Sequence, residues 1–91
     1  MLERDIEAAV GRYARSLGFL NYKFTSPSHI GVCDRIFIAR GGRMLFVEFK
    51  ATGKKPTVMQ LREHERLREQ GCRVYVIDSV EAGRKMLDEN V

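Results

Sequence analysis

The first part of the chain has the hydrophobic spacing of an amphipathic helix. Four apolar residues recur at intervals of four, three and four positions, which places them on one helical stripe: Ile6, Val10, Tyr13 and Leu17. Gly18 supplies a stop signal, so the pattern predicts a helix over residues 2–17. Glu3 continues the apolar stripe by one turn, which is an unusual position for a solvated acid.

Extended segments follow this helix. Loose alternation predicts a strand over residues 19–26, and apolar runs predict two more strands over residues 33–39 and 44–50. Gly41 and Gly42 lie between the last two runs and form a hairpin signal. The run at 44–50 begins with continuous apolar residues, so we expect a central strand that is covered on both faces.

The last third of the chain alternates between helix and strand. A helix over residues 57–70 is predicted to open with a capping box, because Thr57 is followed three positions later by Gln60. A strand over residues 73–77 and a helix over residues 80–89 complete the order α-β-β-β-α-β-α. This order predicts an α/β fold without internal repeats.

The composition is that of one folded domain. The 91 residues are 44% apolar and 31% charged, so we expect a single domain over residues 1–91. No apolar run exceeds four residues, which excludes a membrane-spanning segment, and the acidic N-terminus argues against a secretory signal. Cys33 and Cys72 form no disulfide framework. We therefore expect a reduced protein in the cytoplasm, which is the host cytoplasm if a phage encodes it.

The charge of the chain is unevenly distributed. Residues 1–56 carry a net charge of +5 and residues 57–91 a net charge of −1. A basic half suggests a polyanionic partner, of which nucleic acid is the commonest. An ordinary basic surface would give the same balance, so charge alone leaves both interpretations open.

The candidate chemistry lies at the end of the third predicted strand. Glu48 and Lys50 are two positions apart, so they project from the same face of that strand. The hairpin brings Asp34 to the same end. A two-residue turn would pair Asp34 with Phe49 on the other face, whereas a three-residue turn or a bulge would unite it with Glu48 and Lys50. The sequence leaves this register open.

Two carboxylates at one strand end form a hard-oxygen site that suits Mg²⁺ or Mn²⁺. Such an ion would polarise a phosphodiester and orient water for in-line attack, while Lys50 would hold that water or stabilise charge on phosphorus. Glu3 is a candidate for a third carboxylate at this site.

Each of these residues also has a simpler interpretation. Glu48 and Lys50 would form an exposed pair on an ordinary strand, and Gln60 would serve only in the capping box. Glu3 would be a favourable charge on the helix dipole. The two histidines, His29 and His64, lie in a polar loop and among charged helix neighbours, so we expect both at the surface.

Three stretches carry a resemblance to a known family: Gly31-Val-Cys-Asp34, Arg43-Met-Leu-Phe-Val-Glu-Phe-Lys-Ala51 and Gly53-Lys-Lys-Pro-Thr-Val-Met-Gln60. Together they resemble the VRR-NUC nucleases of the PD-(D/E)xK superfamily, over nearly the whole chain. The resemblance implies a restriction-endonuclease-like core, in which helices flank a mixed four-stranded sheet. It also implies metal-dependent cleavage of DNA by a homodimer, on branched DNA such as Holliday junctions.

The resemblance implies roles for individual residues. It assigns catalysis to Asp34, Glu48, Lys50 and Gln60. It assigns the metal to Asp34, Glu48, the backbone carbonyl of Phe49, and Glu3. Two departures from the family pattern stand out. Cys33 occupies the position of an expected proline, which should alter the backbone locally, and Glu7 stands where many relatives have glutamine. Either Glu3 or Glu7 would then reach the metal, and the apolar stripe favours Glu3.

No segment resembles a base-reading helix, so we expect the protein to select DNA by shape. The phosphates would be contacted by Lys54, Lys55, Arg40 and Arg43. Two alternatives remain open. One is a nicking or restriction-type nuclease with the same chemistry, and the other is a non-catalytic nucleic-acid-binding module. A module without activity would have no need for the intact set of Asp34, Glu48 and Lys50.

Overall fold

The seven elements of the fold follow the order predicted from the sequence. The computed structural model describes residues 1–91, and its bounds are α1 Glu3–Ser16, β1 Leu20–Lys23, β2 Arg35–Ile38, β3 Met44–Phe49, α2 Val58–Glu69, β4 Arg73–Ile77 and α3 Val80–Asp88. The main difference is that β1 and β2 are shorter than predicted. Cys33 and Asp34 precede β2 in the loop rather than belonging to the strand. No helix has the length and apolar content that a membrane crossing requires.

The strands form one mixed sheet in the order β1-β2-β3-β4. β1, β2 and β3 pair antiparallel, and β4 pairs parallel with β3. β3 is therefore a central strand, as its apolar run predicts, and its carboxyl end lies beside the carboxyl end of β4. The prediction of a mixed four-stranded sheet flanked by helices is confirmed.

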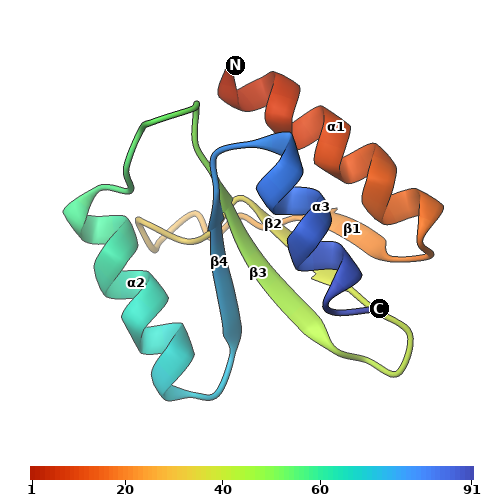
Figure 1. The fold of residues 1–91 in the computed structure, drawn as a ribbon. Coiled ribbons are helices and arrows are strands. Elements are labelled where there is room, and N and C mark those ends of the chain that lie inside the picture. The colour runs from red at the N-terminus through yellow and green to blue at the C-terminus, as the bar shows by residue number, and fades with distance from the viewer.

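The main core lies between the sheet and two helices that run side by side, α1 and α3 (Figure 1). Alternate residues of β3 face this core and are fully buried: Leu45, Val47 and Phe49. Gly83 lets α3 approach α1 closely, because a Cβ atom there would lie 2.4 Å from Cγ2 of Val10. The remaining β3 side chains, including that of Glu48, point to the opposite face, where α2 packs against β4.

The register of the β2–β3 hairpin is that of a three-residue turn. Arg35 pairs with Val47, and the backbone N–H of Ala39 donates to the carbonyl of Arg43 at 2.8 Å. Arg40, Gly41 and Gly42 therefore form the turn, and both glycines have a positive φ, 90° and 86°. Continued by one residue, this register sets Asp34 opposite Glu48. Of the alternatives that the sequence leaves open, the structure adopts the one that unites the two acids on one face.

Candidate active site

The two acids meet at the carboxyl end of β3. Asp34 is fixed by the backbone of that strand, because its Oδ2 accepts a hydrogen bond from the N–H of Phe49 at 2.7 Å. Glu48 is only 1% exposed, although it carries a carboxyl group. A buried acid in a strand needs polar partners, since burial without a hydrogen bond or a countercharge costs several kcal/mol.

Helix α2 supplies those partners. Gln60 donates from Nε2 to Oε2 of Glu48 at 3.0 Å, and Nε2 of His64 lies 3.4 Å from Oε1. Gln60 also keeps its place in the capping box, where its Oε1 accepts from the N–H of Thr57 at 2.9 Å. Both interpretations of Gln60 therefore hold at once: one side-chain amide caps the helix and orients the buried acid.

The expectation that His64 faces solvent is wrong. His64 is fully buried, because it lies four residues after Gln60 and so shares the helix face that covers Glu48. The i, i+4 spacing of Gln60 and His64 is the sequence signal that could have found this contact. His29, by contrast, is half-exposed, and its Nε2 lies 2.6 Å from Oε2 of Glu63.

The electrostatics of the site reflect the crowding of acids. Burial, and then the nearby negative charge of Asp34, raise the pKa of Glu48 to about 8, while Lys50 opposes this shift. Burial and the charge of Asp34 also raise the pKa of Glu3, and Lys50 again acts in the opposite direction. The charges of Asp34 and Lys50 thus act on the carboxyl groups of both Glu3 and Glu48. These four groups are therefore close enough to interact electrostatically.

Glu3 and Glu7 of α1 differ in their partners. Oε2 of Glu7 accepts a hydrogen bond from Nε of Arg35 at 2.6 Å, so Glu7 is engaged in an ion pair on β2. Glu3 makes no such ion pair, and the charges of Asp34 and Lys50 both act on the pKa of its carboxyl. Of these two acids, Glu3 is the one whose carboxylate is available to the site.

The four basic residues predicted to contact DNA lie in two separate places. Lys54 and Lys55 are exposed in the loop that follows β3. Arg40 and Arg43 lie at the other end of the hairpin; five residues separate Arg43 from Glu48, or roughly 17 Å along a strand. Arg43 also donates from Nη1 to the carbonyl of Asn90 at 2.7 Å. Lys54 and Lys55 thus follow the end of β3 that carries Glu48, whereas Arg40 and Arg43 precede the opposite end of that strand.

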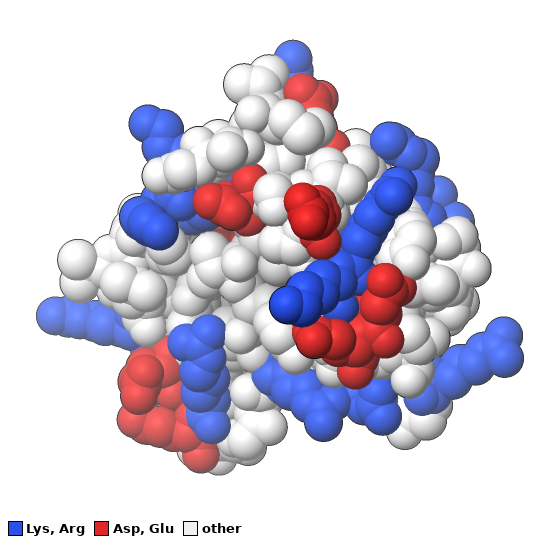
Figure 2. All heavy atoms as spheres, in the orientation of Figure 1, with Lys and Arg blue, Asp and Glu red and all other residues white.

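A second basic surface lies along α1. Four arginines line a hollow of about 440 Å³ with Glu7: Arg4, Arg12, Arg15 and Arg35. The three arginines of α1 lie at intervals of eight and three residues, which is a helical spacing that the sequence analysis did not single out. On the face drawn in Figure 2, basic and acidic side chains are interleaved rather than gathered into one field of a single sign.

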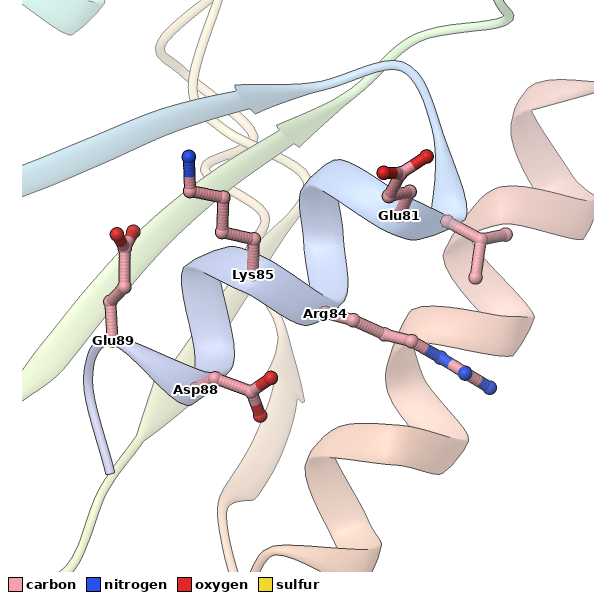
Figure 3. A pocket seen from close by; sticks show the side chains of 6 residues that line it. Glu81, Arg84, Lys85, Asp88 and Glu89 are labelled. Atoms are coloured by element: carbon pink, nitrogen blue, oxygen red, sulfur yellow. The ribbon is translucent and has the colours of Figure 1, made fainter.

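The largest surface hollow, about 470 Å³, is not at the acids. It runs along the outer side of α3 and is lined by Val80, Glu81, Arg84, Lys85, Asp88 and Glu89 (Figure 3). Two of these residues tie α3 to α1: Asp88 accepts a hydrogen bond from the Tyr13 hydroxyl at 2.6 Å, and Arg84 lies over the Tyr13 ring at 5.0 Å. Asp88 and Arg84 in this hollow therefore have a structural role in helix packing. The carboxyl end of β3 is the better candidate for the active site.

Comparisons with known proteins cover almost the whole chain. No family model matches it. "Putative nuclease p44" of Acyrthosiphon pisum secondary endosymbiont phage 1 is 47% identical over 77 residues, which are 85% of this chain and 83% of that protein. A solved structure described as "VRR_NUC domain" matches with a TM-score of 0.90 and 31% identity, over 98% of this chain and 97% of that one. A second, "VRR_NUC domain protein", has a TM-score of 0.81 at 18% identity, over 97% and 86% of the two chains, and shares the fold.

Proposed function

Because the chain belongs to the VRR-NUC family, we propose that it is a metal-dependent DNA endonuclease that hydrolyses phosphodiesters and selects branched DNA. The observation that carries this proposal is the shared face of Asp34, Glu48 and Lys50, with Glu48 buried and held by Gln60. An acid that is buried and oriented beside a second acid is costly for a purely structural strand. A non-catalytic binding module would have no use for it.

The donor set at the strand end fits Mg²⁺ or Mn²⁺. Asp34, Glu48 and the Phe49 carbonyl offer only oxygen atoms, with Glu3 as a further carboxylate, and hard divalent cations prefer such ligands. Burial and, after it, the charge of Asp34 raise the pKa of both Glu48 and Glu3, and a bound divalent cation would offset both effects by favouring the ionised carboxylates. When bound, the ion would act as a Lewis acid on the phosphodiester and ease deprotonation of the attacking water.

The residues of the chain have distinct tasks in this mechanism. Lys50 places an ammonium group beside the two acids, where it would position the attacking water and stabilise the negative charge that grows on phosphorus. Asp34 and Glu48 would hold the ion. Gln60 fixes the orientation of the Glu48 carboxylate and so keeps the site organised before the substrate arrives.

The proposed DNA surface begins at Lys54 and Lys55 and serves phosphates rather than bases. The arginine-lined hollow on α1 is a second candidate surface, and it would receive another arm of a branched substrate. Arg40 and Arg43 would contact DNA only where it extends to the far end of the sheet. We also propose a homodimer, because two copies would present two cleavage centres to the two strands of a junction.

The test compares a four-way junction, a flap and a linear duplex side by side in Mg²⁺, in Mn²⁺ and in EDTA. We expect cleavage of the branched substrates, dependence on the metal, and no cleavage by Asp34→Asn. Undiminished cleavage in EDTA would refute the metal mechanism. Equal cleavage of all three substrates would favour the nicking or restriction-type alternative, and light scattering at the working concentration would decide the oligomeric state.

A further inference from the structure

A second group of potential metal ligands lies behind the carboxylate of Glu48. The sulfur of Cys33, a carboxylate oxygen of Glu48 and a ring nitrogen of His64 all lie within 4.8 Å of one another. All three side chains are buried, with exposed fractions of 0%, 1% and 0%. They come from three separate segments: the loop before β2, strand β3 and helix α2. Their convergence in the interior is therefore a property of the fold and not of one local motif.

One member of this group, His64, lacks an ordinary structural explanation. Nδ1 of His64 is buried and has no hydrogen-bond partner, which is rare for a polar atom in a protein interior. The other ring nitrogen makes only the long 3.4 Å contact with Glu48. Cys33 is a free thiol, and Cys72, the other free thiol, lies elsewhere and is partly exposed. An imidazole with an unpartnered buried atom, next to a buried thiol and a buried acid, indicates a ligand that is shared among them.

The donor atoms specify what kind of ion this ligand would be. One sulfur, one nitrogen and one oxygen form a set that suits Zn²⁺ and other borderline transition metals, whereas Mg²⁺ prefers oxygen alone. Zinc bonds of about 2.0–2.3 Å at tetrahedral angles place ligand atoms about 3.3–3.8 Å apart. The three atoms, which lie within 4.8 Å of one another, must therefore approach by up to about 1 Å on binding. The charges also balance, because a thiolate and a carboxylate together neutralise one Zn²⁺.

We propose that Cys33, Glu48 and His64 form a zinc site, and that Zn²⁺ bound there inhibits DNA cleavage by withdrawing Glu48 from the oxygen-ligand site. Glu48 is a neighbour of Asp34 as well as of Cys33 and His64, so the two sets of donors share this carboxylate. We expect Zn²⁺ to hold the Glu48 carboxylate with Cys33 and His64, so that it is no longer free to serve the oxygen-ligand site. Binding releases to solvent the thiol proton of Cys33, together with the proton of Glu48 where that carboxyl is protonated, and no oxidation or reduction takes place. The inhibition rests on the proposed nuclease function, whereas the site itself does not.

The first experiment tests the site without DNA. The full-length, metal-free protein is titrated with Co²⁺, which substitutes for Zn²⁺ and has a visible spectrum. We expect a thiolate-to-cobalt charge-transfer band that saturates at one ion per chain and disappears when Zn²⁺ is added. Cys33→Ser and His64→Gln should weaken binding by more than about 100-fold, since even the loss of an outer partner costs 10- to 100-fold. The matched controls, Cys72→Ser and His29→Gln, should retain the band.

The second experiment tests the inhibition. Zn²⁺ should reduce Mg²⁺-supported cleavage by the wild-type protein, and Cys33→Ser should cleave in Mg²⁺ but resist Zn²⁺. X-ray absorption of the wild-type zinc form needs no variant and should show one sulfur ligand at about 2.3 Å. A cobalt spectrum without a charge-transfer band, a band lost with Cys72, or a zinc shell without sulfur would overturn the site. Cleavage by the wild-type protein that Zn²⁺ does not reduce would overturn the proposed inhibition. Absence of all cleavage would refute the proposed nuclease function, and the cobalt spectrum would still decide whether the zinc site exists.

Discussion

Gln60 holds the buried carboxylate of Glu48 from the first turn of α2, with Nε2 of the amide 3.0 Å from Oε2 of the acid. The same amide closes the capping box with Thr57. The start of a helix and the orientation of the proposed metal-binding acid are therefore coupled through one side chain, and two substitutions can separate the two effects.

Gln60→Ala should lose both effects, whereas Thr57→Ala should lose only the cap. Loss of the cap costs about 1 kcal/mol of stability in either variant. Release of Glu48 should lower cleavage about 10- to 100-fold in Gln60→Ala alone, which is the range for removing a group that orients a metal ligand. Chemical denaturation and single-turnover cleavage measure the two quantities. Equal losses of activity in both variants would show that Gln60 only caps the helix.

Asp34→Asn should abolish cleavage and leave DNA binding intact. The side-chain oxygen of asparagine can still accept from the N–H of Phe49, so the hairpin should keep its geometry while the metal loses a charged ligand. A binding titration beside a cleavage assay checks this prediction. A variant that cleaves at the normal rate would show that Asp34 is structural.

Lys50→Ala should reduce the rate of cleavage far more than it reduces DNA affinity. A positioned charged donor is worth about 10²–10³ in rate, whereas one phosphate contact on a wide basic surface costs much less. Lys50→Arg should restore binding but not rate, because its planar fork places the donors differently. Single-turnover cleavage and a binding titration in Ca²⁺ provide the comparison. Parallel losses of rate and affinity would make Lys50 a simple DNA anchor.

The stability of the metal-free protein should fall as the pH rises toward 8. The pKa of Glu48 is raised from 4.5 to about 8, so between these values the unfolded chain has released a proton that the folded protein retains. The contribution is fully present below pH 4.5 and is lost through pH 8. Because Mg²⁺ or Mn²⁺ binds the ionised form, its stabilising effect should grow over the same range. Denaturation curves at several pH values, with Glu48→Gln as the control, measure both trends, and a Glu48→Gln profile identical to that of the wild type would contradict them.

Charge reversal at Lys54 and Lys55 should weaken binding to every DNA shape alike. Each lost phosphate contact should reduce the slope of log K against log salt by about 0.9. For the single reversals at Lys54 and at Lys55, the matched control is reversal of Arg40, which carries one equal charge at the far end of the hairpin and should have a smaller effect. Fluorescence anisotropy at several salt concentrations measures the slopes. An effect confined to one DNA sequence would indicate base readout instead.

The sequence predicts the order of the elements well, because the apolar stripe of α1 and the runs of β2 and β3 follow simple periodicities. It cannot decide the face of Asp34, because that depends on whether the turn at Gly41 and Gly42 holds two residues or three. It misjudges His64 for a different reason. The charged neighbours of His64 suggest an exposed helix, yet the face that α2 presents to the sheet covers a buried acid and is itself polar.

Cys33 illustrates the same limit. The sequence identifies it only as a replacement for an expected proline, because its proximity to His64 depends on how the loop before β2 packs under α2. Contacts between segments 31 positions apart carry no periodicity that a single chain can reveal. The tertiary fold therefore decides which polar residues meet at Glu48.

The length of the three-residue turn in the β2–β3 hairpin determines whether Asp34 and Glu48 share a face, so the proposed activity depends on the number of residues in this turn. Surface loops normally tolerate the gain or loss of a residue, and mutation at such a tip is usually silent. Here the deletion of a single glycine would shift the β2–β3 register by one residue and turn Asp34 to the opposite face of the sheet from Glu48. All of the proposed site residues would still be present in the sequence. In this small enzyme, insertions and deletions at a tip remote from the chemistry should be selected against as strongly as substitutions of the acids themselves.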